Sequence, residues 1–135
     1  MIGKNFILQE FVDKATYDRF GKKSEWFIDQ RLFNISQVLR NKFGPMTINN
    51  WHSGGSRNWS GLRTNKSPYY KPYSQHSFGN AIDIIFKDVT AEEAAEYILN
   101  NETHFRTFGL GGIELGQSWL HIDVRNSDKL IKFYK

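Results

Sequence analysis

The decapeptide SQHSFGNAID at residues 74–83 places an imidazole, His76, and a carboxylate, Asp83, on either side of Gly79. A second histidine, His121, follows in the segment WLHIDV. Two imidazoles and one carboxylate with an open fourth position form a common catalytic zinc arrangement. Gly79 would let the backbone turn so that both side chains of the decapeptide aim at one point. These residue types therefore suggest a hydrolytic metal centre.

Each of these residues also has an ordinary structural explanation. A histidine in a polar loop is usually solvated, and a buried aspartate is more often satisfied by backbone amides or by a nearby arginine. Within the apolar run AIDIIF, however, an unpaired Asp83 carboxylate would cost several kcal/mol to bury, so it needs a partner. From spacing alone, a shared cation and separate local hydrogen bonds are both open.

Alternation in WLHIDV predicts a strand with two different faces. One is a core face, formed by Leu120, Ile122 and Val124. The other is expected to look toward a cleft or solvent and carries Trp119, His121 and Asp123. With Gly111–Leu115 and the turn at residues 116–118, this strand predicts a hairpin. Further strands are expected at residues 46–51 and 81–86.

Helical patterns frame these strands. Ser24 is expected to cap a helix carrying Ile28, Leu32, Ile35 and Leu39, which Gly44-Pro45 ends. Thr90 and Glu93 form a capping-box pattern that opens a second helix. A short helix is possible at residues 8–14. The chain is therefore predicted to be α+β, with helices packed on a small antiparallel sheet.

The composition limits the possible sites and partners. A chain of 135 residues with 39% hydrophobic content suits one domain, residues 1–135, and the absence of cysteine restricts any metal to nitrogen and oxygen ligands. The net charge of +4 favours an anionic partner, but its positive residues are scattered, so nucleic acid is not expected. The N-terminus has acidic residues by position ten and no long apolar run, so we expect no signal peptide, no membrane span and synthesis in the cytoplasm.

The pattern S-x-H-x-x-G-x-A-x-D followed by H-x-D resembles the signature of zinc D-alanyl-D-alanine carboxypeptidases and L-alanyl-D-glutamate endopeptidases. The segments NFILQEF, VLRNKFGPMTINN and SGLR are similar to the small phage-associated branch of that family. The resemblance implies a hedgehog-like zinc fold and cleavage of peptide stems in bacterial peptidoglycan. Because no secretion signal is expected, we expect a phage or prophage enzyme that reaches the cell wall after release or as part of a virion. It is expected to act as a monomer.

By this resemblance the Zn²⁺ ligands are His76, Asp83 and His121. Arg63, in SGLR, would bind a substrate carboxylate or the developing oxyanion, since a guanidinium suits a planar anion. Ser74 and Gln75 are structural or weakly substrate-facing. Neither His52 nor His104 matches a ligand position, and both are expected to be ordinary surface or packing histidines. The aromatic residues around the glycine-rich loop either line a groove or anchor the loop: Trp51, Trp59, Tyr69, Tyr70 and Tyr73.

The general base departs from the family pattern. Many members carry an acidic residue three positions before the last histidine ligand, but this chain has Ser118 there. Glu114, the nearest upstream carboxylate, is the first candidate because it could face His121 across the hairpin, and the similar hedgehog domain also has its glutamate farther upstream. Asp123 is the second candidate for the base. Alternatively, it orients an imidazole or a loop residue by hydrogen bonding. Ser118 also supports an alternative, a non-catalytic zinc-binding phage structural or binding module.

Overall fold

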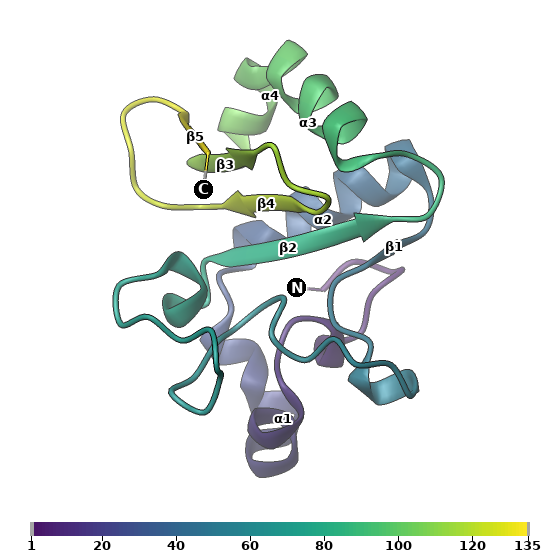
Figure 1. Cartoon of the computed structure of the whole chain (residues 1–135), viewed down its shortest axis with the longest axis vertical. Helices are drawn as coiled ribbons and strands as arrows, with labels where there is room; N and C mark the ends of the chain where they lie inside the picture. Colours follow the sequence, from purple (N-terminus) through teal and green to yellow (C-terminus); the bar gives the residue numbers. More distant parts are fainter. Residues whose placement is uncertain (1, 135) are drawn as a thin grey trace.

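The fold is built on a five-stranded sheet in the order β1-β2-β4-β3-β5 (Figure 1). A computed structural model describes residues 2–134. Neighbouring strands pair antiparallel except β3 and β5, which are parallel. The predicted α+β class is confirmed, but the sheet is mixed rather than purely antiparallel because of the unpredicted β5. The strands are β1 (Met46–Thr47), β2 (Ala81–Phe86), β3 (Gly112–Leu115), β4 (Leu120–Asp123) and β5 (Ile131–Tyr134).

Residues 2–134 form four α-helices, of which α2 lies behind the sheet in Figure 1, α3 and α4 lie beyond the β3 and β4 side, and α1 lies away from the strands. None of the helices in residues 2–134 combines the length and apolarity needed to cross a membrane. The helices are α1 (Lys14–Phe20), α2 (Gln30–Phe43), α3 (Ala91–Asn100) and α4 (Glu102–Thr107), with 3₁₀ turns η1 (Leu8–Glu10), η2 (Gly21–Phe27), η3 (Trp51–Ser53) and η4 (Gln75–Phe78).

The beginning of α2 corrects the sequence prediction. Ser24 lies in η2, and Ile28 after it has an extended backbone that separates η2 from α2. The N-cap is Asp29, whose carboxylate accepts a hydrogen bond from the Arg31 N–H at 2.9 Å. The predicted end is confirmed, because Gly44 follows the last residue with a positive φ of 80°.

The other element boundaries agree in part. The capping box of Thr90 and Glu93 at the start of α3 is confirmed. In the segment from residue 8 to 14, where a short helix was predicted, only the 3₁₀ turn η1 (Leu8–Glu10) forms, and α1 begins at Lys14. Residues 46–51 were predicted as one strand, but β1 ends at Thr47. The next backbone N–H groups do not continue the sheet, since Asn49 donates to the Glu10 carbonyl at 3.0 Å.

The two faces of the sheet have different chemistry. One face is apolar across the central strands, with Ile82, Ile122 and Ile113 in register across β2, β4 and β3 and no exposed surface on any of them. At its edge, β5 places the exposed Lys132 beside Ile113. The neighbouring position on each strand points to the opposite face. There Asp83, His121, Glu114 and Phe133 form one row across β2, β4, β3 and β5. The sheet therefore aligns two of the three predicted ligands, Asp83 and His121, with the predicted base Glu114 as cross-strand neighbours.

Candidate metal centre

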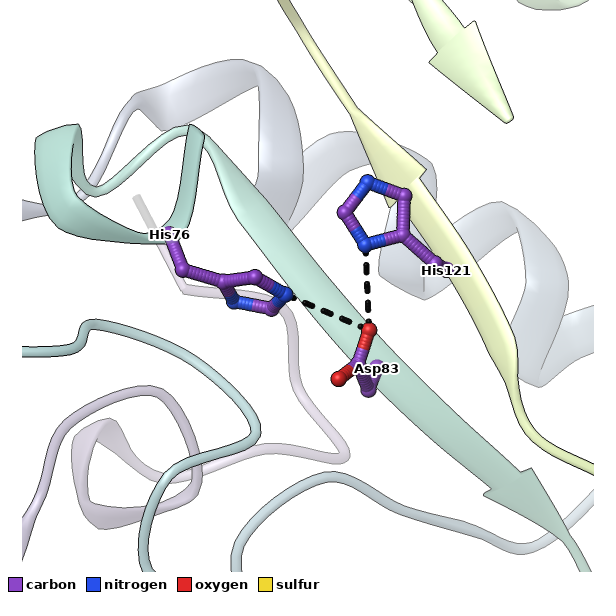
Figure 2. A group of neighbouring side chains, drawn as sticks. All are labelled: His76, Asp83 and His121. Carbon is purple, nitrogen blue, oxygen red and sulfur yellow. Dashed lines mark hydrogen bonds and ion pairs between the residues drawn. The ribbon is translucent and has the colours of Figure 1, made fainter. Parts of the chain in front are cut away.

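His76, Asp83 and His121 converge on one point, and all three side chains are buried (Figure 2). Oδ1 of Asp83 lies 3.3 Å from His76 Nε2 and 3.1 Å from His121 Nδ1. One potential ligand atom from each residue lies within 4.8 Å of the other two. The predicted convergence is confirmed, and this group could hold a metal ion.

His76 is held by the short turn that the decapeptide forms. It lies in η4, where the Ser74 hydroxyl accepts from the His76 N–H at 3.3 Å. The imidazole Nδ1 lies 2.9 Å from the carbonyl oxygen of Gly61. Because a carbonyl only accepts hydrogen bonds, Nδ1 must carry the proton. Nε2 is thereby left to offer its lone pair toward Asp83 and His121.

His121 is held by a carboxylate instead. Its Nε2 lies 2.9 Å from Asp123 Oδ2, and Asp123 is fully buried. Arg125 fixes that carboxylate with two hydrogen bonds, from Nε at 2.8 Å and from Nη2 at 2.6 Å. Asp123 thus accepts the proton of His121 Nε2 and turns Nδ1 toward the cluster. A carboxylate bonded to the outer nitrogen of a histidine is the usual support of a metal-binding imidazole.

The ionisable groups of the cluster depend strongly on one another without a metal. Burial raises the pKa of Asp83, but hydrogen bonds and charge from His121 and His76 outweigh it and hold the pKa well below its ordinary value. Burial lowers the pKa of His121, yet its position between Asp123 and Asp83 raises it to about 9. An imidazole between two carboxylates is stabilised as a cation, and a divalent cation could supply the same charge.

The donor spacing suits a small cation. A tetrahedral zinc site has ligands about 2.0 Å from the ion, which places neighbouring ligand atoms about 3.3 Å apart. The two separations from Asp83 Oδ1, 3.3 and 3.1 Å, are close to this value. Two of the three separations among the donor atoms are therefore compatible with a small divalent cation, such as the zinc predicted from the sequence.

Arg63 contacts the cluster directly. Its Nη2 donates to Asp83 Oδ2 at 2.9 Å, and its Nε donates to the Trp59 carbonyl at 2.8 Å. Burial lowers the pKa of this guanidinium, although the charges of Asp83, Tyr69 and Glu114 oppose that shift. Arg63 therefore holds the carboxylate that was predicted as a ligand, in addition to lining the groove beside it.

The two candidate bases are in different positions. Glu114 is the cross-strand neighbour of His121 and lines the groove. Asp123 has no exposed surface. Its Oδ2 is hydrogen-bonded to His121 and Arg125, and its Oδ1 is hydrogen-bonded to Arg125. Ser118 lies exposed in the turn after β3 and is not part of the groove wall. Glu114 is thus the carboxylate best placed to exchange a proton with a molecule in the groove.

Two glycines make room for this arrangement. Gly79 has a φ of 71°, and a Cβ there would lie 1.7 Å from the Phe27 carbonyl oxygen, so the turn after His76 requires glycine. At Gly112, a Cβ would lie 2.6 Å from Asp123 Oδ1 and 2.7 Å from Arg125 Nε. The absence of a side chain in β3 therefore leaves space for the pair that orients His121.

An open groove of about 910 Å³ leads to the cluster. Four of the five aromatic residues singled out in the sequence line it: Trp59, Tyr69, Tyr70 and Tyr73. The fifth, Trp51, instead anchors the loop, because its Nε1 donates to the Val12 carbonyl at 2.9 Å. Both interpretations of the aromatic residues are thus correct for different members of the set.

The remaining predicted residues are divided between groove and surface. Ser74 and Gln75 line the groove, and Ser74 also caps η4. His52 and His104 are exposed and outside the cluster. Sequence reasoning missed Arg125 and Phe133. Their only signals were an arginine two residues beyond Asp123, on the same strand face, and an aromatic residue in a weakly patterned C-terminal segment.

No family model, curated protein or solved structure matches this chain. The resemblance seen in the motifs therefore stays a prediction.

Proposed function

We propose that this chain is a zinc-dependent peptidase that cleaves the peptide stems of bacterial peptidoglycan, as an endopeptidase or a carboxypeptidase. A phage or prophage lysis or virion-associated enzyme is the setting we infer. The convergence of His76, Asp83 and His121, with both imidazole tautomers set by outside partners, carries this proposal. A groove that ends at the cluster and is lined by aromatic and charged side chains supports a peptide substrate.

When bound by these three residues, zinc would act as a Lewis acid that polarises a carbonyl and makes water nucleophilic near neutral pH. Glu114 takes a proton from the attacking water and delivers it to the departing amine. Arg63 still has Nη1 free of the hydrogen bonds that occupy its Nε and Nη2, so it can meet a substrate oxygen and stabilise its negative charge. Asp123 keeps His121 in the correct tautomer and orientation.

The second candidate is a non-catalytic zinc module, favoured by Ser118 at the position where the resembled family has an acid. Digestion of purified cell walls separates the two candidates. We expect release of free amino groups with zinc, its loss on adding a chelator, and its return on adding zinc again. Stoichiometric zinc with no release of amino groups would instead establish the binding module.

The role of Glu114 is tested separately. Glu114→Gln should lower hydrolysis by about 10²-fold or more while zinc content stays at the wild-type level, because the amide cannot exchange the proton. Glu96→Gln makes the same chemical change on the exposed face of α3 and should digest walls normally. Wild-type turnover by the Glu114 variant would exclude this residue as the base.

A further inference from the structure

Arg57 is a cationic side chain of the groove wall and makes no side-chain hydrogen bond or ion pair within residues 2–134. Its Nε is buried, and buried polar atoms without a partner are rare in folded proteins. Because Arg57 lines the open groove, an anion that enters the groove would meet the outer nitrogens of the guanidinium rather than Nε.

The backbone of Arg57 is held firmly although its side chain is not. Its N–H donates to Asn50 Oδ1 at 2.8 Å. Its carbonyl accepts from the N–H groups of Asn50 at 3.0 Å and Trp51 at 3.2 Å. Because both backbone groups are fixed, binding a ligand would require ordering of the side chain alone and not of the loop backbone.

The charges of the groove wall favour an anion at Arg57. Of the four cationic residues of the wall, Arg63 is paired with Asp83 and Arg125 is paired with Asp123. Arg57 and Lys71 form no ion pair within residues 2–134. Glu114 is the one acidic side chain of the wall outside the metal cluster. The groove beyond the cluster therefore has a surplus of positive charge.

We propose that Arg57 is the anion receptor of the groove and binds a free carboxylate of the substrate peptide, outside the His76–Asp83–His121 cluster. This inference rests on the proposed function and adds a requirement for a carboxylate to it. The two Nη groups of a guanidinium form a planar fork that matches the two oxygens of a carboxylate. Peptide stems offer such groups at the α-carboxylate of D-glutamate and at the C-terminus. Arg63 is less suited because its Nη2 is already bonded to Asp83 and its Nε to Trp59.

The test uses the zinc-loaded full chain and a set of stem peptides, L-alanyl-γ-D-glutamyl-L-lysine, with each of the two carboxylates free or amidated. NMR titration of the labelled protein gives the affinity for each peptide, and the peptide signals report cleavage in the same sample. We expect the wild type to bind one free-carboxylate form about tenfold more tightly than its amide, as for a charge-assisted pair in a groove. Arg57→Gln should bind the two forms equally.

Two further variants keep this test specific. Arg57→Lys retains the charge but lacks the planar fork of the guanidinium and should recover only part of the preference. Arg40→Gln removes one positive charge from a half-buried arginine on α2, outside the groove, and should keep the full preference. Zinc content and circular dichroism should be the same for all variants.

The outcomes separate this inference from the proposed function. A wild type that shows no preference for either carboxylate, or an Arg57→Gln variant that keeps it, overturns the role of Arg57 whether or not the peptide is cleaved. A preference that depends on Arg57 in a sample without any cleavage supports the anion receptor but contradicts the peptidase.

Discussion

The sheet side and the loop side of the groove are built in opposite ways. On the sheet side, each predicted ligand is buried and bonded to an outside partner, such as Gly61 for His76 and Asp123 for His121. On the loop side, Tyr73 is 87% exposed, and Arg57 keeps a buried nitrogen without a partner. The sheet side is thus complete before a substrate arrives, whereas the loop side offers groups that a substrate could satisfy.

This difference separates two tasks. A metal centre needs ligands held in a defined geometry, which strands in register supply for Asp83 and His121 and the turn η4 supplies for His76. Recognition of a substrate profits from exposed aromatic and cationic groups on a loop. We therefore expect changes at the predicted ligands and their supports to act on metal binding and stability, and changes on the loop side to act on substrate alone.

Loss of a ligand on the sheet side should have the largest effect. Asp83→Asn removes the charge shared by both histidines and leaves Arg63 without its ion pair. We expect zinc affinity to fall by at least about 100-fold, more than for loss of a supporting group. Competition with a chromophoric chelator measures it. Asp88→Asn, an exposed position shortly after β2, is the control and should bind zinc normally.

The support of His121 should matter next. Asp123→Asn replaces the carboxylate that holds Nε2 while keeping the shape of the side chain. Zinc affinity should fall by about 10- to 100-fold, since the imidazole becomes a weaker and less well oriented ligand. The same chelator competition measures this loss. Unchanged affinity would show that the hydrogen bond does not position His121.

The pH dependence of the metal-free sheet side should be smaller. The pKa of His121 is raised to about 9 in the folded protein, from 6.5 in the unfolded chain. Its stabilising contribution is therefore full below about pH 6.5 and is lost as the pH rises through about 9. Urea unfolding with chelator present should show the free energy of unfolding falling by on the order of 1 kcal/mol over this window.

The lowered pKa values of Asp83 and Asp123 act in the opposite direction. Their contribution is full above the unfolded value of 3.8 and is lost at lower pH, so the metal-free protein should be most stable between about pH 4 and 6.5. His121→Gln should remove the decline on the alkaline side. A wild-type stability that is constant or rising from pH 6.5 to 9 would contradict this account.

A change on the loop side should leave the sheet side intact. Tyr73→Ser alters a side chain that is almost fully exposed, so the free energy of unfolding should change by less than about 0.5 kcal/mol and zinc affinity should not change. Wall hydrolysis should slow by about two- to tenfold if the ring packs on the substrate. A loss of zinc in this variant would show that the two sides are coupled.

The sequence predicts the sheet side well because its signals are local. Alternation in WLHIDV separates the core face from the face of His121, and an aspartate inside AIDIIF needs a partner. The structure confirms both, together with the α+β class. The predicted start of α2 was wrong because Ser24 and Asp29 are both favourable N-cap residues. The extended backbone of Ile28 separates Ser24 from the helix, so Asp29 is the N-cap. Local capping propensity alone could not choose.

The features missed from the sequence depend on distant contacts. β5 is held by parallel pairing to β3, which is separated from it in the sequence by β4. A local sequence pattern does not show which distant strand a segment will pair with. Arg125 gains its role only because Gly112 on the neighbouring strand leaves room for it. The vacant Nε of Arg57 likewise follows from how the loop folds onto Asn50 and Trp51.

The contact between the two ends of the loop has a consequence for how this protein can be varied. The Arg63 N–H donates to the His76 carbonyl at 3.0 Å, so residues 64–75 form a ring closed at its base. Because the cost of closing such a ring grows only slowly with its length, inserted residues should be tolerated there. Evolution or an engineer could exchange this segment of the groove wall without rebuilding the His76–Asp83–His121 cluster.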